Sequence, residues 1–207
     1  MRILASVLAL VAVGAQQPLP PPFPRPGVTK LFENARVVVW NIAWPKGAPT
    51  ALHRHVLDLV GTYYASGDRL ITEVDGTKRT VTNKAGEVTF RQRGLTHIEE
   101  GISERPLRAV FIELKDDAPS GSTAPPSDAA PPFQTIVRKP ILENARVIVW
   151  SYQSTFGLEG TRHRHDRDAV TVWSDDGTAH AVFVPAGTVH TEEQAGVVES
   201  ATVFEIK

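Results

Sequence analysis

The chain carries the same sequence pattern twice, and this internal repeat constrains its fold more than any other feature. Residues 33–67 and 143–177 align without a gap at an offset of 110, and fourteen of the 35 aligned positions are identical. The first copy opens with ENARVVVW and the second with ENARVIVW. The copies also end alike, with RAVFIELK at 108–115 and ATVFEIK at 201–207. A repeat of this size indicates two similar structural units in tandem.

Both copies are predicted to be all-β. Short β-branched and aromatic runs alternate with turn formers, and no stretch of 12 residues keeps a helical apolar period. Asp-Gly pairs at 75–76 and 176–177 each separate two strand-length runs, which is a strong hairpin signal. Between Gly67 and His97 the first copy has 17 residues more than the second has between Gly177 and His190. We therefore expect the second copy to lack one hairpin.

Composition shifts mark the predicted boundaries. Arg2, an apolar run and small residues up to Ala15 are typical of a secretory signal peptide, so residues 1–15 predict export to the periplasm or secretion. The Pro-rich residues 16–27 predict an extended tether. Residues 28–115 and 134–207 are the two predicted domains, the second shorter, and 116–133, dense in Pro, Ser and Ala, form the predicted linker. We expect no membrane span, because every other apolar run is too short.

The composition narrows the chemistry that the chain can perform. Lys and Arg number 22 against 23 Asp and Glu, which lacks the positive charge typical of nucleic-acid binding proteins. The chain has no cysteine, so disulfides, thiol nucleophiles and iron–sulfur clusters are excluded. Histidines, carboxylates, hydroxyls or a bound metal must then supply any activity.

Six of the seven histidines occupy matched positions in the two copies. A His-x-His pair on a strand places both imidazoles on one face, and a third histidine from a distant strand can complete one side of a metal's coordination sphere. A lone histidine would usually be a hydrogen-bonded structural residue, but two matched triplets favour metal binding. The predicted metal ligands are His53, His55 and His97 in the first copy and His163, His165 and His190 in the second.

These motifs resemble those of the cupin superfamily, whose motif one is G(x)5HxH(x)3–4E(x)6G and whose motif two is G(x)5PxG(x)2H(x)3N. The second copy supplies the PxGxxH of motif two at Pro185 to His190, with Gln194 where Asn is usual. The first copy keeps Gly94 but has Gln92 in the Pro position. The resemblance covers both predicted domains. It implies a bicupin, two tandem jelly-roll (double-stranded β-helix) barrels of six to eight strands each.

One departure from the family pattern concerns the glutamate that normally completes motif one. We assign its positions to Val60 and Val170, so the usual fourth metal ligand is absent from both copies. Asp58 and Asp168 lie two residues earlier on the same strand face. We expect these two aspartates to end a turn or to pair with neighbouring arginines, Arg54 and Arg164, rather than to bind metal.

Two other carboxylates are better placed to take part in chemistry. Glu99 and Glu192 each lie two residues beyond the third histidine, so on a continuing strand both would point toward the metal. We assign them as the candidate acid or base groups. Trp40 and Trp150, which end matched strands, are expected to cap the barrel cores.

The leading interpretation is an exported bicupin that binds a divalent metal (Fe, Zn, Mn, Ni or Cu) through three-His sites. Such a site leaves coordination positions open, and the resemblance implies a metal-dependent, dioxygenase-like oxidoreductase acting on a small organic acid or phenol. The alternative is a non-catalytic small-ligand or metal-binding module. A third option is a structural barrel pair with relic histidines. We expect a small-molecule ligand and no nucleic acid, and we allow for a homodimer.

Overall fold

The computed structural model describes residues 18–116, 130–137, 139–154, 160–193, 196–197 and 199–207. These residues are almost entirely β-strand and turn, with a single helical turn, α1, at Phe133–Ile136. No helix among them is long and apolar enough to cross a membrane. The predicted signal peptide and most of the predicted linker lie outside the described residues. The predicted all-β class is confirmed.

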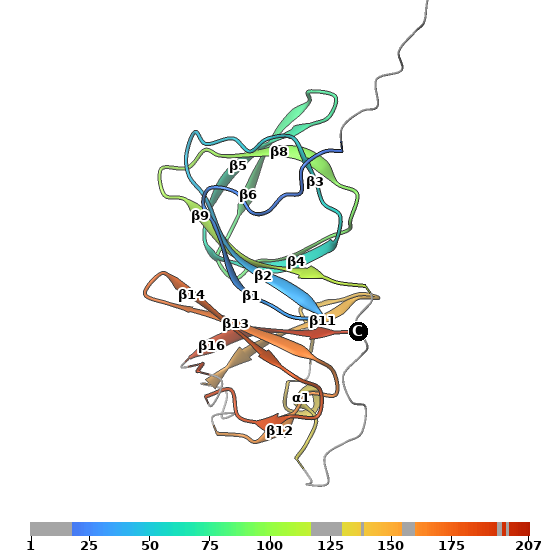
Figure 1. Ribbon diagram of the computed structural model, residues 1–207. Helices are drawn as coiled ribbons and strands as arrows, with labels where there is room; N and C mark the ends of the chain where they lie inside the picture. The colour runs from blue at the N-terminus through green and yellow to red at the C-terminus, as the bar shows by residue number, and fades with distance from the viewer. Residues whose placement is uncertain (1–17, 117–129, 138, 155–159, 194–195, 198) are drawn as a thin grey trace, which may run out of the picture.

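Two sheets close into the barrel of the first lobe (Figure 1). One sheet has the strand order β1-β2-β9-β4-β7 and the other β3-β8-β5-β6. The strands are β1 (Val28–Glu33), β2 (Val37–Trp44), β3 (His53–Arg54), β4 (Asp58–Ala65), β5 (Gly67–Glu73), β6 (Lys78–Asn83), β7 (Val88–Arg91), β8 (Thr96–Gly101) and β9 (Leu107–Leu114).

The second lobe repeats this plan with fewer strands. Its larger sheet has the order β10-β11-β16-β13-β14, and its smaller sheet is the antiparallel pair β12-β15. Two tandem jelly-roll barrels are therefore present, as predicted. The strands are β10 (Leu142–Glu143), β11 (Val147–Gln153), β12 (His163–Arg164), β13 (Ala169–Asp175), β14 (Thr178–Val184), β15 (Val189–His190) and β16 (Ser200–Ile206).

The hairpin that the second lobe was expected to lack is β5–β6 of the first lobe. These two strands pair over Gly67–Asn83 and extend the smaller sheet. In the second lobe the chain turns from β13 straight into β14 through Asp176 and Gly177, whose φ angles are 43° and 76°. Positive φ at both central residues is the geometry that favours Asp-Gly in two-residue hairpins.

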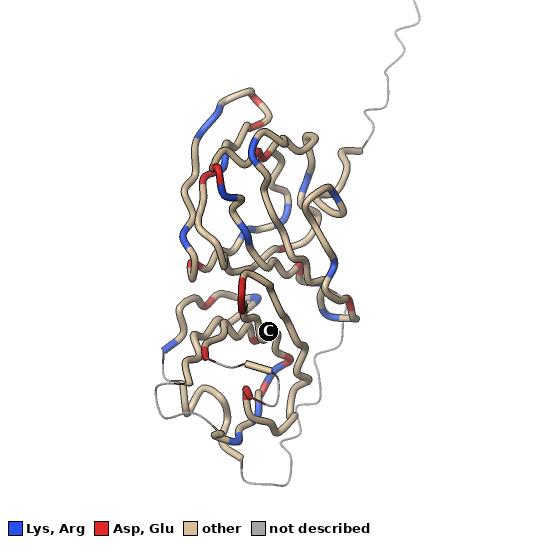
Figure 2. Tube along the Cα trace, turned by 90° about the vertical axis from the view of Figure 1, so that its left-hand side faces the viewer, with Lys and Arg blue, Asp and Glu red and all other residues tan. Residues whose placement is uncertain are grey.

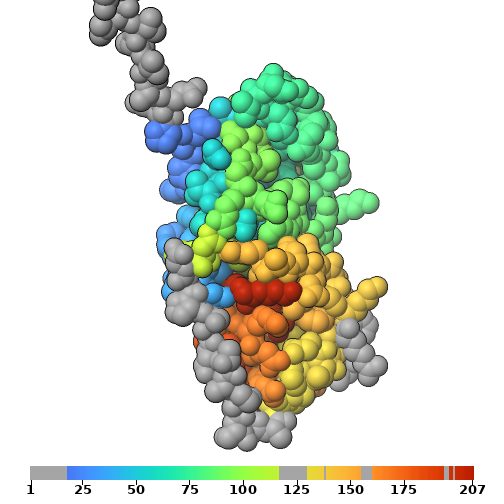
Figure 3. All heavy atoms as spheres, turned by 90° about the vertical axis from the view of Figure 1, so that its right-hand side faces the viewer, coloured from blue at the N-terminus to red at the C-terminus, as the bar shows by residue number. Residues whose placement is uncertain are grey.

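The larger sheets of the two lobes pack face to face, and Figure 3 shows the lobes in direct contact. A continuous buried cluster joins them, built from β-branched and other apolar side chains of both copies. Each barrel also has its own interior core on the opposite face of the same sheet. Strand alternation explains this arrangement, because Val37 and Val39 point toward the other lobe whereas Val38 and Trp40 point into the barrel.

Matched ion pairs connect the lobes in both directions. Arg36 Nε lies 3.1 Å from Asp168 of the second lobe, and Arg146 Nε lies 3.4 Å from Asp58 of the first. The expected pairing of the two aspartates with Arg54 and Arg164 was therefore wrong. Their strand face is the one that meets the other lobe, so arginines from across the interface reach them. Elsewhere, basic and acidic residues are interspersed over both lobes (Figure 2).

A proline-rich segment, here called the strap, lies against each barrel, at residues 18–27 in the first lobe and 130–137 in the second. The amide of Arg54 donates to the carbonyl of Pro20 at 3.1 Å, and the amide of Arg164 donates to that of Pro131 at 3.0 Å. Phe23 packs on Trp40 with ring centroids 5.2 Å apart, and Phe133 packs on Trp150 at 6.2 Å. The segments predicted as tether and linker thus include residues that lie against the barrels, because each delivers a phenylalanine to an apolar interior.

Candidate metal centres

The three matched histidines of the first lobe converge inside its barrel. His53 of β3 lies directly opposite His97 of β8 in the strand register, and His55 follows two residues after His53. The Nε2 atoms of His55 and His97 are 3.4 Å apart. His53 Nδ1 lies 3.0 Å from the carbonyl of Ala51, so its N–H donates there and its Nε2 is free to act as a ligand. All three side chains are buried.

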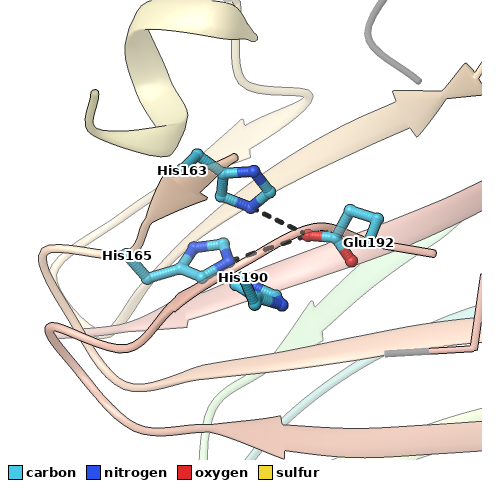
Figure 4. A group of neighbouring side chains, drawn as sticks. All are labelled: His163, His165, His190 and Glu192. Atoms are coloured by element: carbon cyan, nitrogen blue, oxygen red, sulfur yellow. Dashed lines mark ion pairs between the residues drawn. The ribbon is translucent and has the colours of Figure 1, made fainter. Parts of the chain in front are cut away.

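The second lobe repeats this geometry and adds a carboxylate (Figure 4). His163 of β12 lies opposite His190 of β15, and His163 Nδ1 is 3.0 Å from the carbonyl of Thr161. Glu192 Oε1 lies 3.3 Å from His163 Nε2 and 3.7 Å from His165 Nε2. The four ligand atoms of His163, His165, His190 and Glu192 all fall within 4.8 Å of one another.

Both clusters fit a divalent metal ion. The Nε2 atoms of His53, His163, His165 and His190 are buried without a hydrogen-bond partner among the described residues, as are both carboxylate oxygens of Glu192. Burying polar atoms unpaired costs free energy, and a cation would satisfy them. Ligand atoms about 3–3.5 Å apart are what metal–nitrogen bonds near 2.1 Å require. Two buried His and Glu groups in this protein could therefore hold a metal ion.

Burial keeps three of the six imidazoles, His55, His97 and His190, in the neutral form that binds metals. Desolvation lowers the pKa of His55 to about 4 and that of His190 to about 4, and it also lowers the pKa of His97. For His165, burial is outweighed by the carboxylates of Glu192 and Glu205, and the pKa is raised. Neutral imidazoles need not lose a proton before they coordinate a cation.

The carboxylate of Glu192 is anionic despite its burial. Burial alone would raise its pKa, but the neighbouring imidazoles of His163 and His165 outweigh that effect and lower the pKa to about 2. Glu205 supports the same site from behind, because its Oε1 lies 3.2 Å from His165 Nδ1 while its Oε2 accepts from the indole of Trp150. Carboxylates that hold a ligand histidine in this way fix its orientation.

The first-lobe counterpart, Glu99, lies in a different environment. Arg69 Nη1 donates to its Oε1 at 2.6 Å, and the indole of Trp44 donates to its Oε2 at 2.9 Å. Arg25 of the strap approaches Oε2 at 3.5 Å. Burial opposes ionisation, but Arg69 and then His97 outweigh it and lower the pKa of Glu99 to about 2. The roles predicted for Glu99 and Glu192 as acid or base remain predictions, and their surroundings differ sharply.

The motif-one position that faces the metal is one residue earlier than the sequence indicated. Val60 and Val170 belong to the cluster between the lobes, so neither points toward the histidines. Leu59 and Ala169 point into the barrels instead. Both positions are apolar, so the predicted absence of a motif-one glutamate ligand is unchanged.

A small cavity adjoins the first-lobe histidines. Its volume is about 30 Å³, which is room for about one water molecule. Apolar side chains and the buried network around Arg69 enclose it. Its lining includes Phe23, Leu59, Tyr63, Arg69, Phe111 and Glu99 beside His55 and His97.

Sequence reasoning missed three features of these sites. The tripeptide Pro-Pro-Phe recurs at 21–23 and 131–133, at the same offset of 110, and it would have revealed the straps. Glu113 and Glu205 are matched near the ends of the last strands, and each accepts the indole N–H of a matched tryptophan, Trp40 or Trp150. The role of Arg69 had no signal, since it comes from the hairpin that occurs only once.

Comparisons with known proteins give matches among solved structures. No family model matches the chain, and no curated protein matches it. A cupin domain from Bordetella pertussis is 30% identical, with a match that covers 45% of this chain and 99% of that one at a TM-score of 0.41. An RmlC-like cupin family protein from Methanocaldococcus jannaschii is 15% identical (55% and 93% covered, TM-score 0.36). The polyketide cyclase RemF from Streptomyces resistomycificus is 19% identical (44% and 66% covered, TM-score 0.37).

The match to the Bordetella domain identifies the family, because 30% identity extends over nearly the whole of that domain. The histidine motifs quoted above and the two jelly-roll lobes agree with it. The chain therefore belongs to the cupin superfamily.

Proposed function

We propose that this protein binds one divalent metal ion in each lobe and that the first-lobe centre acts as a dioxygenase-like oxidoreductase on a small organic substrate. The observation that carries the proposal is the convergence of His53, His55 and His97 on one point beside a cavity. Three protein ligands leave coordination positions open, as catalytic metal sites require.

The residues around the first site suit such chemistry. A metal held by the three imidazoles would supply Lewis acidity and, for a redox-active ion, electron transfer to dioxygen. Leu59 and Phe111 line the cavity and exclude bulk water. The Tyr63 hydroxyl accepts from Arg69 Nη2 at 2.8 Å and keeps its own proton for a hydrogen bond to substrate. Burial raises the pKa of Tyr63, so this proton stays in place at neutral pH.

A specific observation favours the alternative, a non-catalytic metal-binding or small-ligand module. Glu99 is held by Arg69 and Trp44, and its pKa of about 2 makes it a poor acid and a weak base at neutral pH. The cavity of about 30 Å³ would also have to widen before an organic substrate could enter. Metal binding is common to the enzyme and to the metal-binding form of this module.

Metal analysis of matched variants tests the proposal. The purified protein, reloaded with Fe²⁺ or Zn²⁺ and freed of excess metal, should contain two ions per chain. His55→Ala and His165→Ala should each lose one ion and retain the other. A parent protein that holds no metal would overturn the enzyme and the metal-binding module, and would leave only the module that binds a small ligand.

Oxygen uptake then separates the two functions. The iron-loaded protein is given a panel of small organic acids and phenols in an oxygen electrode. Uptake that His55→Ala abolishes supports the enzyme. A loaded protein without uptake on the panel favours the binding module.

Export remains a prediction from residues 1–15. N-terminal sequencing of protein recovered from the periplasm or medium should begin at Gln16. Recovery from the cytoplasm with Met1 intact would contradict it.

A further inference from the structure

The two sites hold their carboxylates in opposite ways although the lobes derive from one pattern. Both oxygens of Glu192 lack a hydrogen-bond partner among the described residues, and its Oε1 faces the imidazoles. Both oxygens of Glu99 are engaged instead, one by Arg69 and the other by Trp44. Accordingly, Glu192 groups with its three histidines as a possible fourth ligand, and Glu99 does not.

The three residues that hold Glu99 have no equivalents among the described residues of the second lobe. When the two copies are aligned at the offset of 110, Ser154 occupies the position of Trp44 and Thr135 occupies that of Arg25. Arg69 lies on β5, a strand with no equivalent among the described residues of the second lobe. Among the described residues, no arginine or indole is bound to the carboxylate of Glu192, and the Nε2 atoms of His163 and His165 lie 3.3 Å and 3.7 Å from its Oε1.

The charges around the two sites differ as a result. In the second lobe, two carboxylates lie against the histidines, Glu192 and Glu205, and together they would balance a divalent ion. In the first lobe, Glu99 faces two guanidiniums, Arg69 and Arg25, so the cluster of these three side chains carries one positive charge before any metal binds. A divalent ion would raise that excess further. Uncompensated buried charge is costly, so a loaded first site calls for an anion.

The two histidine sites also differ in access, because the second is covered by a buried side chain and the first adjoins a cavity. Phe133 is fully buried, and its ring lies 4.9 Å from that of His163 and 4.8 Å from that of His165, so it covers the second site. At the first site Phe23 borders the cavity, and the cavity reaches His55 and His97. Sites closed by four protein ligands are usually structural, whereas three ligands beside open space are usual for exchange and catalysis.

We propose that the two centres have different tasks. The second is a closed, charge-balanced site in which Glu192 is the fourth ligand and the metal is retained as part of the fold. The first is an open three-histidine site whose metal takes a small anionic ligand, which Arg25 and Arg69 favour. This inference rests on the proposed metal binding in both lobes.

Metal retention tests the first half of the proposal. The protein loaded with two Zn²⁺ ions is mixed with excess EDTA, and released zinc is followed with time. We expect one ion per chain to leave quickly and the other to leave at least about tenfold more slowly, since losing a ligand or its support costs tenfold or more in affinity. Glu192→Gln should accelerate the slow phase, whereas the matched Glu99→Gln should leave it unchanged. A single phase, or a slow phase that Glu192→Gln does not alter, would overturn the division.

Azide, a small anion that binds metals, tests the second half. The Co²⁺-loaded protein is titrated with azide and the visible absorption is followed. One azide should bind per chain, His165→Ala should still bind it, and His55→Ala should not. Arg25→Met keeps the apolar contacts of the strap but removes one charge, and should weaken azide binding by about tenfold. Binding that only His165→Ala abolishes, or that Arg25→Met leaves unchanged, would refute the assignment.

The two levels of inference fail in distinguishable ways. If no ion binds, the proposed function itself is wrong. If two ions bind but leave together, and azide does not distinguish the sites, metal binding stands and the division between the lobes falls.

Discussion

The duplicated ion pairs between the lobes allow a prediction with a built-in control. Arg36 and Arg146 occupy equivalent positions, and each reaches an aspartate of the other lobe. We compare Arg36→Met with Arg146→Met, which remove the same charge and keep a similar apolar stem. Equivalent sequence positions would suggest equal losses of stability, but the surroundings of the two aspartates predict a large difference.

The magnitude follows from burial. The side chains of Arg36 and Asp168 are 10% and 5% exposed, and at an effective dielectric of about 20 two charges about 4 Å apart attract by about 4 kcal/mol. Without Arg36, Asp168 keeps the backbone amide of Ala186 at 2.9 Å, so we expect a loss of about 3 kcal/mol, the lower end for breaking a buried pair. Asp58 keeps both the amide and the guanidinium of Arg93, so Arg146→Met should cost about 1 kcal/mol or less.

Urea unfolding of the metal-free proteins measures both losses. The midpoints are compared where the slope of free energy against urea is unchanged from the parent, so that the exposed surface is the same. Asp168→Asn in the Arg36→Met background should recover part of the loss, because it removes the unpaired buried charge. Equal losses for the two arginine variants, or a larger loss for Arg146→Met, would refute the reasoning from burial.

Three further predictions concern other buried positions of the two lobes. Gly61→Ala should lower stability by about 2 kcal/mol or more in urea unfolding, because its Cβ would lie 2.1 Å from the Phe111 ring and 2.3 Å from a backbone carbonyl. Phe133→Ala should cost about 3–5 kcal/mol by the same measurement, since a fully buried ring is lost. Glu205→Gln should weaken metal binding in the second lobe by about 10–100-fold in a chelator competition, because the carboxylate holds His165. The matched Glu113→Gln should leave first-lobe affinity unchanged, and equal effects would contradict the role given to Glu205.

The sequence could predict the features that depend on neighbouring residues, such as strand faces and hairpin turns. Strand alternation made each His-x-His pair share a face, and the Asp-Gly pairs fixed the hairpin turns. The same parity showed that Asp58 and Val60 share a face, but it could not tell whether that face meets the metal or the other lobe. Which lobe face is covered depends on contacts between distant parts of the chain. The partners of Glu99 were hidden for the same reason, because Arg25 and Arg69 approach it from separate segments.

The extra hairpin of the first lobe explains why Glu99 and Glu192 differ in backbone conformation and in their partners. In the first lobe, β5 pairs with β8 and places Ile71 opposite Glu99, so the backbone of Glu99 is fixed within a continuous strand. The same strand brings Arg69 to the carboxylate. In the second lobe, β15 ends at His190, no described strand pairs with the residues that follow it, and Glu192 lies in the next turn. A residue in a turn can direct its side chain to the histidines, whereas a residue on a paired strand is held in register. The presence or absence of 17 residues therefore affects both the backbone conformation and the charged partners of the carboxylate nearest each candidate metal centre.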